Sequence, residues 1–448
     1  MSPASPRRYA VAGTGHRSEM YVRALLTSHA DVGSLVSWCD TNPVRMSYYD
    51  QLAAELAPGA KLPTSYPAAD FDRLLDETEP DGLIVTTPDY LHSDYICRGL
   101  DRGLRVISEK PLTTDREKAT AIAEAATRST GDVTVTFNYR YSPRNTLVKE
   151  LISRGEIGEI TSVHFEWLLD TGHGADYFRR WHREKDKSGG LLIHKASHHF
   201  DLVNWWLADT PHSVTALGGL RFYGADNARR RGDQDAAVTS RDLAVDDPYR
   251  IDLAADERLR RLYLEAEHVD GYQRDRHVFG EPITIEDTMN VLVGYQRGAQ
   301  LTYSLYAYAP WEGYRVAFNG TRGRIELDVV ERPHRARDDA EVDPSARQEQ
   351  AAGSEDPVEA RQRGSRLLVQ RHWERAHEVP IPEGKGGHGG GDVRLLDDLF
   401  RGDGNDPLGH RAGWQAGLRS VAIGICANES MISGQTVPVD SLGLPLSE

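Results

Sequence analysis

The chain has 448 residues, of which 39% are hydrophobic and 27% are charged, and its formal net charge is −15. This length favours two domains, and the negative charge argues against nucleic acid or an anionic membrane as a partner. No apolar run is long enough to cross a bilayer, and three scattered cysteines favour a reducing cytoplasm over a disulfide framework.

The first predicted strand, residues 9–12, breaks at a Gly-x-Gly turn and continues as a helix over residues 19–26. The glycines allow a tight turn, and the free N–H groups at the helix start can bind a pyrophosphate. Ser18 stands where the usual fingerprint has its third glycine, so a plain strand-turn-helix is the alternative. The residues expected to bind a dinucleotide here are Gly13, Gly15, His16 and Arg17.

The second predicted strand, residues 35–40, ends in Asp40, which lies 25 residues after Gly15. An acid at this distance is expected to bind the ribose 2′-hydroxyl of a dinucleotide. Asp40 therefore favours NAD over NADP, while nearby Arg45 leaves NADP as the alternative.

Three further strands are predicted, and each ends in polar residues. They run into Thr87-Pro88 with His92, into Glu109-Lys110-Pro111, and into Asn138-Tyr139-Arg140-Tyr141. Strands and helical stretches alternate throughout residues 8–141. This alternation predicts an α/β fold with a doubly wound parallel sheet, in a dinucleotide-binding domain over residues 1–141.

Residues 189–201 combine a glycine pair with three histidines, a lysine and an aspartate. On one continuous helix, His194, His198 and Asp201 would share a face, and Lys195 and His199 would form a second pair rotated by about 100°. The apolar residues that follow would pack this helix on a core, so its start is expected to open into a cleft. Asp201 is expected either to orient the ring of His198 or to act in capping and packing.

These motifs together resemble the Gfo/Idh/MocA family of nicotinamide-dependent sugar enzymes. The resemblance is carried by the Gly-x-Gly turn, Thr87-Pro88 with His92, Glu109-Lys110-Pro111 and residues 138–141, and it covers roughly residues 8 to 330. Residues 189–201 resemble the family's motif Gly-Gly-x3-Asp-x3-His-x2-Asp, but His194 stands where an aspartate is usual.

The resemblance implies a Rossmann domain followed by a substrate-binding α/β domain, residues 142–448, with an open and mostly antiparallel sheet. The outer face of that sheet commonly makes dimers or tetramers in the family. The sequence fits this second domain, with a strand from Ser162 and a strand meander over residues 284–327.

Three stretches of the second domain are set apart by composition. Residues 221–280 form a charged insertion that is too polar for a core, and its end is expected either to cover the sugar site or to be a solvated excursion. Residues 331–365 are expected to be a mobile linker. Helices are expected within residues 392–431. A glycine-rich segment with His388 precedes them. The family resemblance brings His388 toward the substrate, and the alternative is that this segment is a flexible linker.

The resemblance also assigns site residues. The cofactor NAD is expected to contact the first turn and Asp40 together with Thr87, Pro88, His92, Glu109 and Lys110. A sugar or glycoside is expected to contact Lys110, Tyr139, Arg140, His194, His199 and His388. The residues expected to carry catalysis are Lys110, His194, Lys195 and His198, with His198 as the leading proton acceptor.

The same histidines also suit a metal site. His194-x3-His198 has zinc-ligand spacing, and Asp201 or His388 would be a further ligand. The family transfers hydride without a metal, and Lys195 would repel a dication. We therefore expect no metal.

The resulting expectation is an NAD-dependent enzyme that transfers a hydride at a secondary hydroxyl, at C3, of a pyranose or pyranoside. The alternative is a redox-neutral glycoside hydrolase that oxidises C3 transiently, with Arg179, Arg180 and Arg183 suiting an anionic sugar such as a sulfonated one. A nucleotide-binding protein without turnover is a third reading, which the intact Glu109-Lys110-Pro111 argues against.

Overall fold

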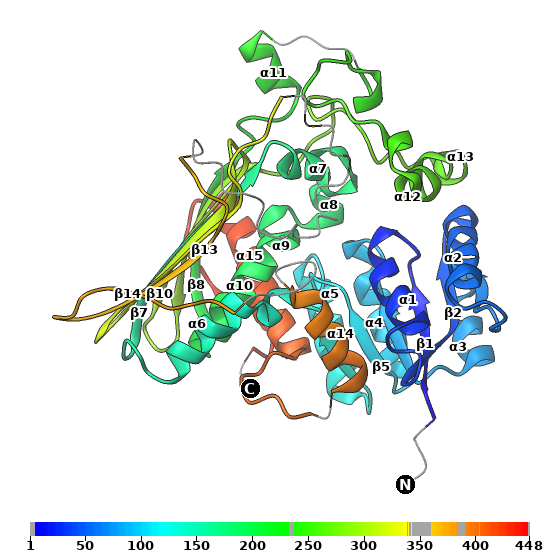
Figure 1. The fold of residues 1–448 in the computed structure, drawn as a ribbon, viewed down its shortest axis with the longest axis horizontal. Helices are drawn as coiled ribbons and strands as arrows, with labels where there is room; N and C mark the ends of the chain where they lie inside the picture. Colours follow the sequence, from blue (N-terminus) through cyan, green and yellow to red (C-terminus); the bar gives the residue numbers. More distant parts are fainter. Residues whose placement is uncertain are drawn as a thin grey trace.

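The computed structural model describes residues 5–232, 237–337, 339, 342, 360–382, 390–402 and 404–446. Two sheets dominate the fold, with helices packed between them (Figure 1). In the described part of the chain, even the longest helix, residues 414–433, is too polar to cross a bilayer.

The first sheet has seven strands in the order β15-β6-β5-β4-β1-β2-β3, all parallel except β15. Its strands are β1 Arg7–Ala12, β2 Gly33–Asp40, β3 Thr64–Pro67, β4 Gly82–Val85, β5 Arg105–Ser108, β6 Asp132–Val135 and β15 Ala412–Gly413. Its helices are α1 Glu19–Leu26, α2 Pro43–Leu56, α3 Phe71–Thr78, α4 His92–Asp101 and α5 Arg116–Arg128. The doubly wound parallel sheet expected from the sequence is confirmed.

The second sheet has nine strands in the order β14-β13-β12-β11-β7-β10-β9-β8-β16. They are β7 Ile160–Asp170, β8 Pro211–Gly219, β9 Thr288–Tyr295, β10 Gln300–Ala309, β11 Glu312–Gly320, β12 Gly323–Arg332, β13 Gly364–Arg371, β14 His377–Glu378 and β16 Val437–Pro438. The helices of this half are α6 Pro143–Ser153, α7 His173–Arg179, α8 Lys185–Ser188, α9 Leu191–His194, α10 Ala196–Leu207, α11 Ala225–Arg231, α12 Glu257–Leu259, α13 Glu267–Asp270, α14 Gly391–Arg401 and α15 Trp414–Ser433.

The predicted meander over residues 284–327 is wrong in one respect. Strand β7 lies between β10 and β11, pairing parallel with β10 and antiparallel with β11. Local turn signals predicted the β9–β10 and β11–β12 hairpins, but the insertion of β7, whose Ser162 pairs with Gln300 of β10, leaves no local signal. The second sheet is therefore mixed, although most of its pairs are antiparallel.

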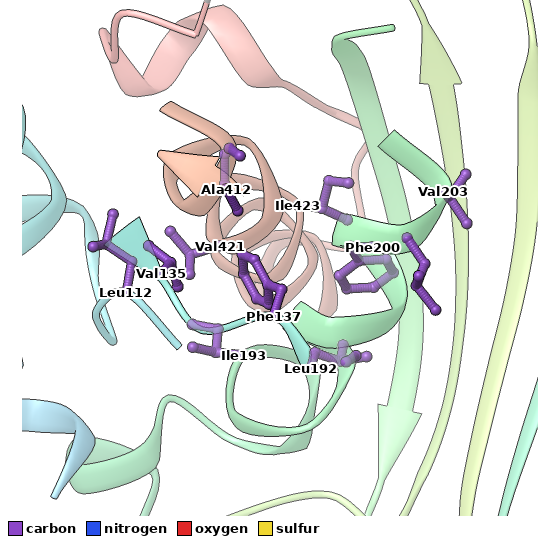
Figure 2. Close-up of a cluster of buried hydrophobic side chains, with 14 of the residues drawn as sticks. Leu112, Val135, Phe137, Leu192, Ile193, Phe200, Val203, Ala412, Val421 and Ile423 are labelled. Carbon is purple, nitrogen blue, oxygen red and sulfur yellow. The ribbon is translucent and has the colours of Figure 1, made fainter. Parts of the chain in front are cut away.

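A shared core joins the two halves. Figure 2 shows Val135 and Phe137 from the end of β6 facing Val421 of α15, and Leu192 of α9 and Phe200 of α10 beside them. Gly424 of α15 lets the helix pass α9 closely, because a Cβ there would lie 2.7 Å from the carbonyl oxygen of Leu192. The long helix α15 thus fixes the position of α9 and α10 relative to the first sheet.

The composition of residues 221–280 predicts an insertion outside the core, but the structure places part of this insertion inside a core. Leu253, Leu259 and Leu262 are fully buried and belong to the same apolar cluster as side chains of β1, α1 and α2. In Figure 1 the segment with α12 and α13 lies over α1 and α2. A few leucines anchor it to the first domain, and some of its charged residues, such as Arg274 and Asp275, are buried as well.

The expected linker at residues 331–365 falls mostly outside the described residues. Within the described part, β12 extends to Arg332 and β13 begins at Gly364, so both ends of the stretch belong to the second sheet. These strand ends correct the expected bounds of the linker.

Candidate active site

A cleft of about 1020 Å³ lies at the carboxyl ends of β1, β2, β4 and β5 and reaches across to α7–α10 and to β12 and β13. Open parallel sheets bind ligands at this edge. The cleft is lined by every residue that the sequence assigned to the cofactor: Gly13, Gly15, His16, Arg17, Asp40, Thr87, Pro88, His92, Glu109 and Lys110.

The turn after β1 is shaped for a close approach. Gly13 has φ +89°, and a Cβ at this position would lie 2.7 Å from the backbone nitrogen of Thr87. The hydroxyl of Thr87 is buried and has no hydrogen-bond partner among the residues that the structure describes. A glycine that cannot be replaced and a buried polar atom without a partner both fit a bound dinucleotide.

Asp40 is held rigidly at the end of β2. Its carboxylate accepts hydrogen bonds from the backbone N–H groups of Thr14 and Asn42 at 2.7 and 2.8 Å. The guanidinium of Arg45 lies 3.6 Å from Asp40 and 2.8 Å from Asp270 of the insertion. Arg45, the residue that left NADP as an alternative, is therefore already paired with two carboxylates.

Glu109 connects the first turn to the end of β5. It accepts hydrogen bonds from Arg17 at 2.6 Å and from the hydroxyl of Tyr21 at 2.7 Å. Burial acts to raise the pKa of Glu109, but Arg17 and Tyr21 outweigh it and hold this pKa below its usual value. Glu109 is thus an ionised structural anchor beside Lys110.

Lys110 enters the cleft next to His194. Its Nζ lies 3.1 Å from the carbonyl oxygen of His194 and 3.4 Å from His194 Nε2. His194 Nδ1 lies 2.5 Å from Asp89 Oδ2, so lysine, imidazole and carboxylate form a continuous chain. His92 supports it by contacting the carbonyl oxygens of Thr87 and Pro111.

Burial shifts the ionisation of this chain. It lowers the pKa of Lys110 to about 8. It also lowers the pKa of His194 well below its usual value, with Lys110 adding to the effect, and raises the pKa of Asp89. Lys110 is therefore poised to lose a proton near neutral pH, and proton transfer is most efficient near the operating pH.

The continuous helix expected through His194, His198 and Asp201 is interrupted at Lys195. Gly189 and Gly190 have φ +69° and +80°, α9 ends at His194, and α10 begins at Ala196. This break brings His194, Lys195 and His198 to the cleft. Lys195 donates to the hydroxyl of Tyr139 at 3.1 Å, and the ring of Tyr139 stacks on His198 at 4.3 Å.

Two expected substrate residues lie elsewhere. Arg140 and Asp201 form a buried ion pair of 2.6 Å, and neither of them lines the cleft. His199 points into the core, where it contacts the hydroxyl of Tyr303 at 2.7 Å and stacks on Trp167. The face of α10 that carries His199 packs on the second sheet, and the structure places both Arg140 and His199 away from the cleft.

Of the three arginines expected to suit an anionic sugar, Arg180 lines the cleft and lies 3.2 Å from Asp176. Arg179 donates to the carbonyl oxygen of Tyr249. Arg183 donates to backbone carbonyls of residues 277–282. Two of the three thus hold the insertion in place.

The cleft contains further polar residues that sequence reasoning missed. His182 is buried and its ring centroid lies 4.1 Å from that of His194. His173 and Tyr177 are four residues apart on α7, a spacing visible in the sequence, and they meet Glu312 of β11. The insertion contributes Tyr263, whose hydroxyl accepts a hydrogen bond from the backbone N–H of His16 at 2.9 Å. This part of the insertion lines the cleft, as residues 270–274 also do.

His388 lies outside the described residues. Asp392, soon after it, accepts a hydrogen bond from Asn138 at 2.7 Å and lies 3.8 Å from Arg17. In the part of the chain that the structure describes, no three His, Cys, Asp or Glu side chains are grouped as metal ligands.

The geometry agrees with comparisons to known proteins. Residues 7–137 match the model of an oxidoreductase family with an NAD-binding Rossmann fold, and residues 149–439 match the C-terminal alpha/beta domain of the same family. The chain belongs to the Gfo/Idh/MocA oxidoreductase family. As in this family, the first domain binds NAD, and the cofactor predicted from Asp40 is confirmed.

Individual members of the Gfo/Idh/MocA family resemble the chain to different extents. A Bacillus subtilis (strain 168) protein named as an oxidoreductase, YteT, is 36% identical over 417 residues, which are 90% of this chain and 91% of YteT. Inositol 2-dehydrogenase of Rhizobium meliloti (strain 1021) is 27% identical over 48% of this chain and 58% of its own length. The structure of the WlbA dehydrogenase from Bordetella pertussis in complex with NADH and UDP-GlcNAcA shares the fold, with a TM-score of 0.60, 20% identity, and coverage of 97% of this chain and 98% of that one.

Proposed function

We propose that the protein oxidises a secondary hydroxyl, at C3, of a pyranose or pyranoside by hydride transfer to NAD. The observation that carries this proposal is the Lys110–His194–Asp89 chain at the carboxyl end of β5. The similarity to an enzyme named for inositol supports a polyhydroxylated ring as substrate.

The roles of the residues follow from their contacts. Bound NAD supplies the hydride acceptor. Lys110, with its pKa near 8, takes the proton of the reacting hydroxyl, and His194 with Asp89 steadies the charge that arrives. His198, stacked on Tyr139, lines the same cleft and is left as a second base rather than as the first.

The test is to incubate the purified protein with NAD and a panel of free pyranoses and methyl and aryl pyranosides. NADH absorbance and the site of oxidation by NMR are the readouts. We expect NADH with a 3-keto product. Oxidation at another carbon, or NADH with none of the ring substrates, would contradict the proposal.

A second candidate function is redox-neutral hydrolysis of a glycoside, in which the sugar is reduced again before it leaves. The observation that favours it is a second set of proton-transfer groups, Tyr177, His173 and Glu312, in the same cleft. An anionic glycoside is the finer version of this candidate, and Arg180 supports it. Release of the aglycone over many turnovers without net NADH distinguishes it from simple oxidation.

We also propose that copies of the chain associate through the outer face of the second sheet. The inner faces of β8 and β9 are buried, while Leu217 and Leu292 on the other face are 73% and 56% exposed. Large exposed apolar side chains on a flat sheet favour a protein interface.

A further inference from the structure

Three side chains that line the cleft form a hydrogen-bonded chain separate from that of Lys110. His173 Nδ1 lies 2.6 Å from Glu312 Oε1, and His173 Nε2 lies 3.1 Å from the hydroxyl of Tyr177. A carboxylate only accepts hydrogen bonds, so Nδ1 carries a hydrogen and Nε2 faces the phenol. All three residues line the cleft.

The chain is preorganised by its surroundings. The backbone N–H groups of Gly172 and His173 donate to Asp170 at 2.8 and 3.0 Å, which fixes the start of α7 at the end of β7. Tyr177 and Glu312 are each only 6% exposed. Fixed, desolvated hydrogen bonds of this kind are stronger than the same bonds in water.

Tyr177 stands next to the first proton-transfer chain without joining it. Its ring centroid lies 5.5 Å from that of His194 and 5.7 Å from that of His182. Within the residues that the structure describes, no hydrogen bond connects Tyr177 to Lys110, His194 or Asp89. Two separate hydrogen-bonded networks therefore line the same cleft.

Oxidation of an alcohol releases one proton from one oxygen, and the Lys110 chain is sufficient for it. A second buried network in the same cleft is therefore available to act on another atom of the substrate. Burial raises the pKa of Tyr177 to about 12, so this phenol holds its proton at neutral pH. A group that holds its proton until a stronger base develops beside it is suited to be an acid.

We propose that Tyr177, supplied by His173 and Glu312, is the general acid that protonates the departing oxygen of a glycoside. This inference rests on the proposed C3 oxidation and gives the site its substrate class, a pyranoside with an alkyl aglycone rather than a free sugar.

The step balances as follows in a pyranoside already oxidised at C3. His198 takes the proton from C2, the electron pair of that C–H bond forms the C1=C2 double bond, and the bond between C1 and the aglycone oxygen breaks. The oxygen takes the phenolic proton of Tyr177, and Tyr177 is then reprotonated through His173 Nε2. Glu312 stabilises the histidine before the transfer.

The test compares two leaving groups in the full-length protein with NAD. The substrates are the methyl and 4-nitrophenyl glycosides of whichever pyranose gives the largest NADH signal in the panel. Because 4-nitrophenolate leaves without a proton, Tyr177→Phe should slow methanol release about 10²–10⁴-fold. We expect it to change 4-nitrophenol release and NADH formation by less than about tenfold. His173→Gln and Glu312→Gln should weaken methanol release in the same selective way.

Tyr66→Phe is the matched control, because Tyr66 also donates to a carboxylate, Glu77, but does not line the cleft. Equal losses with both aglycones in all three variants would reduce the chain to a structural role. A wild-type protein that forms NADH but never releases an aglycone would overturn the relay and leave the oxidation intact. Absence of NADH and of aglycone with every pyranoside would instead remove the proposed function itself.

Discussion

The guanidinium of Arg140 donates two hydrogen bonds to the carboxylate of Asp201, with Nε 2.7 Å from Oδ2 and Nη2 2.6 Å from Oδ1. Both side chains are almost completely buried, and Arg140 also donates to the carbonyl oxygen of Gly409. The pair therefore ties the end of the first sheet to α10 and to the segment before β15. Arg140 and Asp201, which resemble active-site residues in the sequence, thus form a buried ion pair that connects the two domains.

Removing one partner of this pair should cost far more than removing an exposed pair. Asp201→Ala leaves the guanidinium of Arg140 buried and unpaired, and we expect the free energy of unfolding to fall by about 3–5 kcal/mol. Glu326→Ala, which breaks a surface pair with Arg324, should cost less than about 1 kcal/mol. Urea unfolding of both variants is the measurement, and similar losses would show that the buried pair has no special weight.

Lys110→Ala should abolish hydride transfer while leaving NAD binding in place. We expect kcat to fall about 10²–10⁴-fold, since the proton of the reacting hydroxyl loses its acceptor. Lys118→Ala removes a lysine paired with Asp115 outside the cleft and is the control. Unchanged turnover in Lys110→Ala would end the assignment.

The wild-type rate should also follow the ionisation of Lys110. Burial lowers the pKa of this lysine to about 8, and the neutral amine is the form that accepts a proton. At pH values below about 8 the cationic form dominates, so kcat/KM should rise with pH and level off above about 8. A pH series of initial NADH rates at subsaturating substrate is the check, and a rate that falls across this window would contradict the base role.

Asp40→Ser tests the choice of cofactor. Loss of a charged acceptor should weaken NAD binding about ten- to hundredfold relative to NADP, which corresponds to a charged hydrogen bond. Asp76→Ser, at an exposed acid on α3, should change neither affinity. Titration of both nucleotides is the measurement, and an unaltered preference for NAD would remove Asp40 from the recognition of the ribose.

Gly13 can be tested against a glycine of similar backbone conformation. Gly13 and Gly59 have φ +89° and +81°, but a Cβ at Gly59 would meet nothing within 4 Å. Both alanine variants carry the backbone strain of about 1–3 kcal/mol, while only Gly13→Ala also pushes on Thr87. Gly13→Ala alone should lose NAD affinity. Equal affinity in the two variants would argue against a close approach of the cofactor.

Association through the second sheet predicts that a charge on its outer face separates the copies. Leu292→Lys should lower the molar mass measured by light scattering to that of one chain. Val245→Lys, at an 88% exposed apolar residue of the insertion, should leave the mass unchanged. A wild-type protein that is already a single chain would contradict this proposal.

Local patterns in the sequence predicted the elements that depend on neighbouring residues. The helix expected at residues 19–26 is α1, and the strand ending at Asp40 is β2. Helical spacing failed at residues 194–201, because α9 ends at His194, α10 begins at Ala196, and His199 lies in the core. The spacing of residues along the sequence does not predict that break.

The Tyr177 network also shows that spacing along the sequence does not predict contacts between distant segments. His173-x3-Tyr177 is a readable helical pair, but its third member, Glu312, is 139 residues away on another strand. Strand order decides that contact, and the unexpected position of β7 beside β11 brings the start of α7 to Glu312. Chemistry assembled from neighbours in sequence was predictable, and chemistry assembled by sheet topology was not.

The contact between β1 and α14 has a consequence for how the chain is made. The ring of Phe400 meets the ring of Tyr9 edge-on at 5.3 Å, and Leu395 and Leu399 belong to the same cluster. At the usual speed of synthesis, roughly ten to fifty seconds separate the emergence of the first 141 residues from that of α14. During this time the apolar surface of the first domain that α14 later buries is exposed to solvent. The nascent chain should therefore depend on a chaperone or on rapid translation until α14 is synthesised.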